Sequence, residues 1–235
     1  MPSGQSPINF LRVSSKPGLI LQHSELGTPA RLGEWLHERA LPFVVHHVWK
    51  QPPPDPREFG FVVSLGSEQS AGAREPGWVR EEIAVLREAV RAGVPVLGVC
   101  FGGQALSAAL GGGAQPLASP EIGWIAVDSV DRAVPGGPWM HYHRELMRVP
   151  PGAREVARSP AGPAAFRSGP HLGLQFHPEA DASLVELWAR TDSELAEAGL
   201  TPDALASQTA AHADGARERA LRLFDGWLAA ARAAR

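Results

Sequence analysis

The chain has 235 residues, a length typical of one α/β domain, and its formal net charge of −3 with dispersed signs gives no reason to expect a nucleic-acid partner. A single cysteine excludes an internal disulfide, and the absence of a run of about 18 apolar residues predicts no membrane span. The first residues lack a basic region followed by an apolar stretch, so we expect no signal peptide and a cytoplasmic protein.

Apolar segments alternate along the chain between strand-like runs and helix-like periodicity. Residues 1–17 show neither pattern and are expected to form a loose lead-in. Short apolar or β-branched runs predict strands at residues 18–22, 42–48, 59–65, 94–99, 121–130 and 172–176. Apolar residues at helical spacing predict helices at residues 31–40, 79–90, 104–110, 183–190 and 216–233.

The order of these elements predicts the fold class. Strands that alternate with helices favour an α/β fold with a doubly wound, largely parallel central sheet flanked by helices. Residues 121–130 and 154–166 are expected to add a small antiparallel extension. No linker or repeat divides the chain, so we expect one domain over residues 1–235, with the C-terminal helices of residues 181–235 packed on it.

The only cysteine, Cys100, lies at a sharp corner between a predicted strand and a predicted helix. Gly98 and Gly102 flank it with one residue between on each side, which is typical of an elbow that carries a nucleophile on a strained turn. A helix N-terminus behind the sulfur also favours thiolate over thiol. A lone cysteine is more often inert core filling, but the elbow favours a nucleophile.

A histidine and a carboxylate follow the strand predicted at residues 172–176. His177 ends this segment, and Glu179 lies two residues later. A cysteine nucleophile needs a base that holds it as thiolate and a third group that orients the base. Because sites in open α/β sheets form at the carboxyl ends of strands, we expect Cys100, His177 and Glu179 to lie together. The alternative for Glu179 is a plain surface carboxylate after a proline turn.

The motifs G-V-C-F-G-G-Q at residues 98–104 and Q-F-H-P-E at residues 175–179 closely resemble those of the class I, or triad, glutamine amidotransferases. More specifically, the chain resembles free-standing relatives of the glutaminase domain of GMP synthetase, and the resemblance covers about residues 18–180. The resemblance implies hydrolysis of the glutamine side-chain amide without a cofactor. Cys100 would form a γ-glutamyl thioester, His177 would protonate the departing ammonia and then activate water, and Glu179 would orient the imidazole.

The resemblance also implies an oxyanion hole made by two backbone N–H groups. Phe101, directly after the nucleophile, would supply one of them. The family takes the other from a turn with two glycines and a proline. Here Gly66 matches the first glycine and would also border the substrate, whereas Ser67 replaces the second glycine and Glu68 the proline. Ser67 would be strained if this position needed a positive φ. If the turn rests with the Ser67 N–H pointing away from Cys100, we expect glutaminase activity to be low until the synthetase partner binds.

Further pocket residues are expected from the same resemblance. Gln104 lies one helical turn after Cys100 and would bind the amino-acid end of glutamine, unless it only caps the helix. Residues 140–150 resemble a family loop that lines the glutamine pocket, in which His143 matches a histidine and Glu145 replaces an aspartate. A His-x-Glu pair alone suggests a metal site, but no other ligands follow at a familiar spacing, so no metal is expected.

The other conspicuous residues are expected to have packing or solvated roles. Residues 121–124 match one more family stretch and are assigned to packing. Histidines outside the motifs are expected to be structural or solvated, namely His23, His46, His47, His141, His171 and His212.

The chain contains no ATP-grasp or pyrophosphatase module and no phosphate-binding P-loop, so it cannot activate an ammonia acceptor itself. The leading interpretation is a glutaminase subunit that takes glutamine as its small-molecule substrate and supplies ammonia to a separate synthetase. Two alternatives stay open. One is a hydrolase of other γ-glutamyl amides or peptides with the same triad, and the other is a non-catalytic regulatory module of the same fold.

Overall fold

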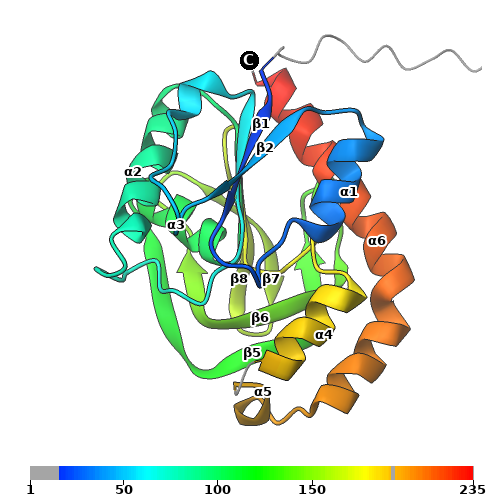
Figure 1. Ribbon diagram of the computed structural model, residues 1–235. Helices are drawn as coiled ribbons and strands as arrows, with labels where there is room; N and C mark the ends of the chain where they lie inside the picture. Colours follow the sequence, from blue (N-terminus) through cyan, green and yellow to red (C-terminus); the bar gives the residue numbers. More distant parts are fainter. Residues whose placement is uncertain (1–15, 192–193, 235) are drawn as a thin grey trace, which may run out of the picture.

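The central element of the fold is a mixed β-sheet (Figure 1). The computed structural model describes residues 16–191 and 194–234, so most of the lead-in predicted at residues 1–17 lies outside the described residues. Within the described part of the chain, nine strands form this sheet. Their order across it is β2 (Phe43–His47), β1 (Gly18–Gln22), β3 (Phe61–Ser64), β4 (Val96–Val99), β9 (His171–Leu174), β8 (Gly162–Ser168), β7 (Arg154–Ser159), β5 (Gly113–Ser129) and β6 (Gly137–Arg148).

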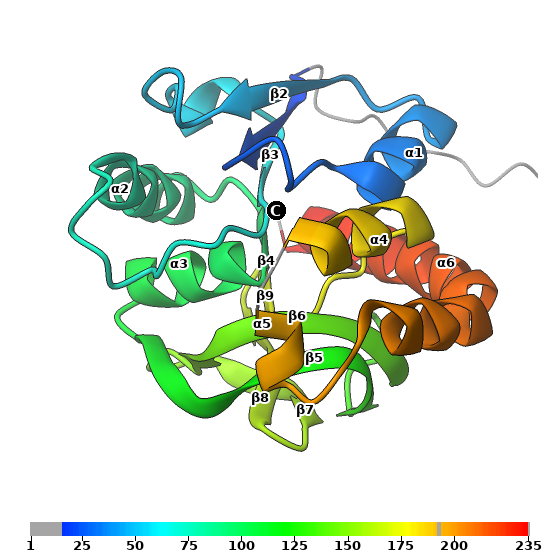
Figure 2. The same ribbon diagram turned by 60° about the horizontal axis from the view of Figure 1, so that its bottom comes forward.

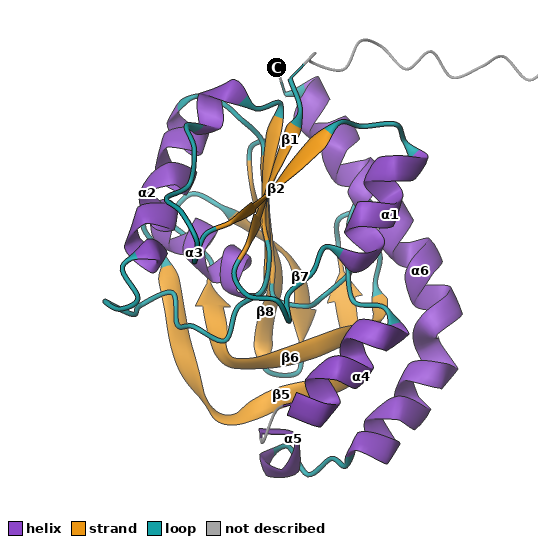
Figure 3. Cartoon of the chain, in the orientation of Figure 1, coloured by secondary structure: helices purple, strands orange, loops and turns teal. Residues whose placement is uncertain are grey.

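The first five strands of this order run parallel, and the other four continue the sheet in antiparallel pairs (Figure 3). Strands β3 and β4 are buried along their whole length, as expected for parallel strands covered by helices on both faces. The predicted α/β class with a flanked central sheet is therefore confirmed, with four of the nine strands in the antiparallel part.

Helices cover both faces of the parallel strands (Figures 1 and 2). The helices on one face are α2 (Trp78–Arg91) and α3 (Phe101–Ala109), and those on the other are α1 (Ala30–Glu38) and α6 (Pro202–Ala233). Each face has its own hydrophobic cluster, with Phe101 and Leu106 in the first and Trp35 and Trp227 in the second. Burying such a side chain contributes about 1.5–3 kcal/mol, so these clusters hold the helices on the sheet.

Three further helices lie outside these two layers in the described part of the chain. The 3₁₀-helix η1 (Pro56–Glu58) follows β2, and α4 (Ala182–Thr191) and α5 (Glu194–Glu197) lie near the β5–β6 ribbon in Figure 2. No helix in the described ranges is long and apolar enough to cross a membrane.

Several elements differ from their predictions. Strand β5 begins at Gly113 instead of residue 121, and the short helix α5 was not predicted. The loop expected at residues 140–150 is mostly strand β6, which pairs with β5 along almost its whole length. Helix α6 begins at Pro202 instead of residue 216, because the Thr201 side chain accepts the Ala204 N–H and proline suits the first helical turn. In the first half of α6, Leu205 is the only large apolar residue, so apolar periodicity alone did not indicate this part of the helix.

Candidate active site

Cys100 occupies the turn between β4 and α3 in a strained backbone conformation. Its φ of 52° and ψ of −109° fall outside the regions that L-residues usually adopt. Close approach of the backbones explains the flanking glycines. A Cβ on Gly98 would lie 2.3 Å from the Gly102 carbonyl oxygen, and a Cβ on Gly102 would lie 2.1 Å from the Ser64 carbonyl oxygen. The turn thus has the backbone geometry of a nucleophile elbow.

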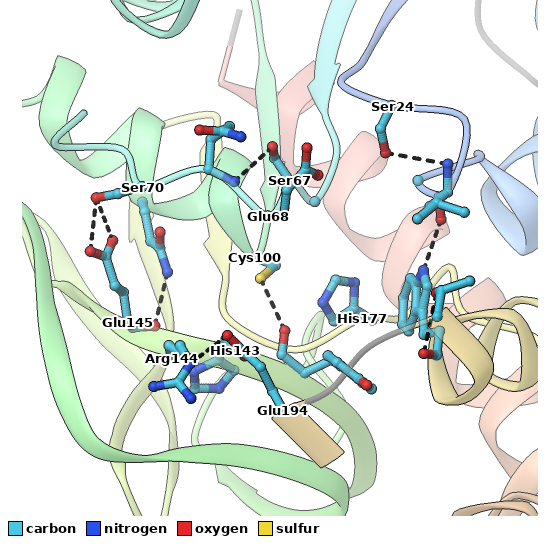
Figure 4. Close-up of a pocket in the computed structure, with 18 of the residues that line it drawn as sticks. Ser24, Ser67, Glu68, Ser70, Cys100, His143, Arg144, Glu145, His177 and Glu194 are labelled. Atoms are coloured by element: carbon cyan, nitrogen blue, oxygen red, sulfur yellow. Dashed lines mark hydrogen bonds and ion pairs between the residues drawn. The ribbon is translucent and has the colours of Figure 1, made fainter. Parts of the chain in front are cut away.

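The parallel pairing of β4 with β9 brings the two sequence motifs together. Val99 lies opposite Leu174, so both strands end at the same edge of the sheet. The Cys100 N–H donates to the Leu174 carbonyl oxygen at 2.8 Å, which ties the elbow to β9. His177 follows β9 by three residues, and Figure 4 shows its ring beside the Cys100 side chain.

His177 and Glu179 form a buried pair. Nδ1 of His177 lies 2.7 Å from Oε1 of Glu179, and the two residues are only 5% and 2% exposed. The Trp188 ring stands edge-on to the imidazole with centroids 4.8 Å apart. Gly66 packs so closely that a Cβ there would lie 2.8 Å from Cε1 of His177. Nε2 of His177 has no hydrogen-bond partner among the described residues, so this nitrogen is available for proton exchange.

The charge of His177 is set by opposing effects. Burial disfavours the imidazolium, but the Glu179 carboxylate and a Cys100 thiolate outweigh it and raise the pKa of His177 to about 10. A protonated His177 beside a thiolate is the ground state that a cysteine nucleophile needs. The pair can therefore hold a negative sulfur and donate a proton through Nε2.

Two further polar groups lie near the Cys100 sulfur. Nε2 of Gln175 is 3.9 Å from Sγ, and the Tyr142 carbonyl oxygen is 3.8 Å from it. The Gln175 amide has a fixed orientation because its Oε1 accepts the Met147 N–H at 2.7 Å. Its NH₂ group consequently points at the sulfur. The sequence analysis did not single out Gln175, although it belongs to the same motif as His177.

The turn after β3 lies against the elbow. The Gly102 N–H donates to the Leu65 carbonyl oxygen at 3.0 Å, which fixes this turn to the first turn of α3. Ser67 does not have a positive φ, so the strain considered for serine at this position is absent from this conformation. The N–H groups of Ser67 and Phe101 therefore belong to two segments that meet at Cys100, and their oxyanion roles remain predictions.

A pocket of about 550 Å³ opens at these residues (Figure 4). This volume lies within the usual range of small-molecule sites. The Phe101 side chain does not line the pocket, and it packs instead on the rings of His23 and Trp78. The other predicted site residues all line it, namely Gly66, Ser67, Cys100, Gln104, His143, Glu145, His177 and Glu179.

Gln104 and Glu145 are linked within this pocket. Nε2 of Gln104 donates to the Glu145 carbonyl oxygen at 2.9 Å, so α3 is joined to β6. The Ser70 hydroxyl donates to the Glu145 carboxylate at 2.8 Å and holds that side chain in place. The pocket thereby presents carboxylate and amide oxygens, which suit a ligand that carries an ammonium group.

His143 also belongs to a buried cluster with Glu121 and His141. Oε2 of Glu121 lies 3.0 Å from Nδ1 of His141 and 2.9 Å from Nε2 of His143. Burial opposes the charge on Glu121, but hydrogen bonds from the two imidazoles prevail and lower the pKa of its carboxyl group, while burial lowers the pKa of His141. Glu121, assigned to packing from the sequence, is thus the hydrogen-bonding partner of His143.

The three ligand atoms of this cluster are close enough together to hold a metal ion. Metal-ligating histidines usually donate their second ring N–H to another group. Here Nε2 of His141 and Nδ1 of His143 have no hydrogen-bond partner among the described residues. The arrangement therefore fits a hydrogen-bonded cluster better than a metal site, and the expectation of no metal stays a prediction.

The sequence analysis gave no indication of a buried pair formed by His23 and Glu82. Nε2 of His23 lies 2.6 Å from Oε2 of Glu82, and neither side chain is exposed. Nδ1 of His23 lies 3.0 Å from the Gly66 carbonyl oxygen, and the Ser64 hydroxyl donates to Glu82 at 2.6 Å. The pair thus reaches the turn that borders Cys100.

Comparison with known sequences identifies relatives of this site and fold. A family model described as glutamine amidotransferase class-I matches residues 69–186. A glutamine-hydrolysing GMP synthase subunit of Ignicoccus hospitalis is 31% identical over 153 residues, which span 61% of this chain and 76% of that protein. The GMP synthases of Aeropyrum pernix and Thermomicrobium roseum are 36% and 38% identical, but the chain spans only 25% and 19% of their lengths.

Solved structures agree with these matches. A glutamine amido transferase of Methylobacillus flagellatus superposes with a TM-score of 0.83 at 26% identity, covering 92% of this chain and 96% of that one. A glutamine amidotransferase of Thermotoga maritima has the same fold, with a TM-score of 0.82 at 23% identity. The chain therefore belongs to the class I glutamine amidotransferase family. It is an enzyme of this type, related to the glutamine-hydrolysing subunit of GMP synthase.

Proposed function

We propose that the protein hydrolyses the side-chain amide of glutamine through a triad of Cys100, His177 and Glu179 and releases ammonia. The observation that carries this proposal is the strained elbow cysteine beside a buried histidine–glutamate pair in a pocket of small-molecule size. The family assignment supports amide hydrolysis as the chemistry.

The first half-reaction forms a thioester. The Cys100 thiolate attacks the side-chain carbonyl carbon of glutamine, a C–S bond forms, and the carbonyl electron pair moves onto oxygen. When this intermediate collapses, the C–N bond breaks and Nε2 of His177 gives its proton to the leaving nitrogen, which departs as ammonia. Glu179 keeps the imidazole oriented through its hydrogen bond to Nδ1.

The second half-reaction reverses these roles with water. Nε2 of His177, now neutral, takes a proton from water, and the oxygen attacks the thioester carbon. The C–S bond then breaks, the Cys100 thiolate returns beside a protonated His177, and the product leaves as glutamate after its new carboxyl group loses its proton to the solvent. Protons and electrons balance over the cycle, with no cofactor required.

Backbone and side-chain donors complete the proposed site. The Ser67 and Phe101 N–H groups would stabilise the oxyanion of both tetrahedral intermediates, each with an effect on the order of a hundredfold in rate. Gln104, Glu145 and His143 would bind the amino-acid end of the substrate. These binding roles are supported by the oxygen acceptors that line the pocket.

The ammonia would pass to a separate synthetase. The chain covers most of the Ignicoccus hospitalis GMP synthase subunit but only a quarter or less of the longer GMP synthases. This pattern supports a glutaminase subunit that docks on its synthetase. A hydrolase of larger γ-glutamyl amides is the second candidate, because a pocket of about 550 Å³ is in the range that accepts drug-sized ligands.

Ammonia release from glutamine tests the proposal directly. The purified chain should release ammonia and glutamate in equal amounts, alone or with a GMP synthetase, and Cys100→Ser should not. Asparagine and γ-glutamyl anilides serve as comparison substrates. Hydrolysis of the anilides but not of glutamine would favour the second candidate, and no release from any amide in either condition would refute both.

A further inference from the structure

The peptide bond between Gly66 and Ser67 is held from the protein interior by His23. The Gly66 carbonyl oxygen can only accept a hydrogen bond, and it lies 3.0 Å from Nδ1 of His23. Nδ1 must therefore carry the proton of this contact. Nε2 of the same ring lies 2.6 Å from Glu82, which fixes the ring from its other side.

The direction of the Gly66 carbonyl decides the direction of the next N–H. In a trans peptide the C=O and N–H groups lie in one plane and point in opposite directions. The Gly66 carbonyl points toward a His23 side chain with no solvent exposure, whereas Ser67 lines the pocket that contains Cys100. Holding the carbonyl toward His23 consequently turns the Ser67 N–H in the opposite direction, and Ser67 lines the pocket.

His23 is itself immobilised by its neighbours. Its ring stacks on Trp78 with centroids 5.2 Å apart and meets the Phe101 ring edge-on at 4.9 Å. Glu82 is fixed a second time by the Ser64 hydroxyl at 2.6 Å, at the end of β3. His23 thus contacts both segments that carry the expected oxyanion donors, one through the Gly66 carbonyl and the other through the Phe101 side chain.

We propose that His23, whose ring is fixed by Glu82, is a positioning residue for the oxyanion hole, and this inference rests on the proposed glutaminase function. The pair does not touch the substrate. It keeps the Ser67 N–H aimed at the oxygen that becomes negative in the tetrahedral intermediate, and it keeps that donor in place before the charge develops.

A matched pair of amide substitutions at His23 separates this role from simple stability. The amide nitrogen of asparagine occupies the position of Nδ1, so His23→Asn keeps the donor to Gly66 and loses the contact with Glu82. The amide nitrogen of glutamine occupies the position of Nε2, so His23→Gln keeps the contact with Glu82 and loses the donor to Gly66. The same two substitutions at His171, a buried histidine at the start of β9, control for a lost buried imidazole.

Two rate measurements distinguish positioning from misfolding. The first is kcat and KM for glutamine hydrolysis, with the synthetase present if the wild-type chain needs it. The second is alkylation of Cys100 by iodoacetamide, which displaces iodide at a saturated carbon and forms no oxyanion. A lost oxyanion donor lowers kcat and leaves alkylation unchanged, whereas a distorted site lowers both.

We expect His23→Gln to lower kcat on the order of a hundredfold, with little change in KM or in the alkylation rate. We expect His23→Asn to keep most of kcat although it melts at a lower temperature, because Glu82 loses its partner. If His23→Asn does not fold, the double variant with Glu82→Gln removes the unpaired carboxylate and gives the same comparison. Equal kcat values for the two variants, or alkylation that falls in parallel with kcat, would overturn the inference. Absence of wild-type activity would instead count against the proposed function.

Discussion

Nδ1 of His177 lies 2.7 Å from Oε1 of Glu179, while Nε2 of the same imidazole has no hydrogen-bond partner among the described residues. Nδ1 thus orients the imidazole ring, and Nε2 is available for proton transfer. The Cys100 side chain lies beside this ring in Figure 4. The different roles of Nδ1 and Nε2 of His177, with Cys100 beside the ring, lead to the first three predictions.

Cys100 should be the only nucleophile of the chain. A diazo-ketone analogue of glutamine should add one adduct, located at Cys100 by mass spectrometry of peptides. Cys100→Ser should lower glutaminase kcat by a factor on the order of 10⁴ or more, because hydroxyl is a far weaker nucleophile than thiolate at neutral pH. Wild-type turnover in Cys100→Ala would rule out the thioester mechanism.

Substitution of His177 should lower the glutaminase kcat more than substitution of Glu179. His177→Ala removes the proton carrier, whereas Glu179→Gln leaves a base that is present but less well oriented. The loss in kcat for Glu179→Gln should therefore be about tenfold to a hundredfold smaller than that for His177→Ala. Steady-state kinetics with glutamine measure both losses, and a fully active Glu179→Gln variant would remove Glu179 from the triad.

The protonation state of His177 should depend on the cysteine. Burial disfavours the charged ring, but Glu179 and the Cys100 thiolate raise its pKa to about 10. Because the pKa is raised, the stabilisation from the positive charge of His177 is complete below the ordinary histidine value near 6.5 and is lost as the pH rises through about 10. Cys100→Ser removes the thiolate, so the pKa of His177 should fall.

Histidine ¹⁵N NMR spectra between pH 6 and pH 10.5 provide the measurement of this pKa, in a range set by the raised and ordinary values. The His177 signal is assigned by its loss in His177→Gln. A titration midpoint that is the same in wild type and in Cys100→Ser would show that no thiolate acts on the imidazole.

The Ser67 position tests whether the oxyanion turn moves. Activation by a partner through a peptide flip predicts that Ser67→Gly raises basal activity, because glycine reaches other backbone conformations at lower cost. Ser67 already has an unstrained φ, and the Gly66 carbonyl is held by His23. We therefore expect Ser67→Gly to change basal kcat by less than about threefold. Loss of an oxyanion donor, by comparison, lowers the rate on the order of a hundredfold. A tenfold rise would support the flip and contradict a fixed peptide.

The local sequence pattern was sufficient to predict those parts of the site that are set by residues adjacent in the sequence. The elbow at Cys100 and the histidine after β9 each follow a short apolar run, and parallel pairing then brings them together. Strand β6 was not predicted, because its ribbon with β5 alternates buried and exposed residues irregularly. Its pairing with β5 is a tertiary feature that the segment alone does not show.

Contacts between residues that are distant in the chain were not predictable in this way. His23 and Glu82 are 59 positions apart, and no spacing rule connects them. Glu82 lies on α2 beside an apolar stripe, where an acidic residue normally faces solvent. Its complete burial is explained only by His23 and the Ser64 hydroxyl, both of which reach it through the fold.

The single cysteine also determines how the enzyme responds to oxidants. A thiolate that is oxidised to sulfenic acid is normally rescued by a second thiol, which condenses with it to form a disulfide. Cys100 is the only cysteine in the chain, so no resolving thiol is available within the chain. Recovery after peroxide exposure therefore depends on a thiol from outside the chain. Without such a thiol, further oxidation to the sulfinic acid is irreversible, and the catalytic sulfur is lost permanently.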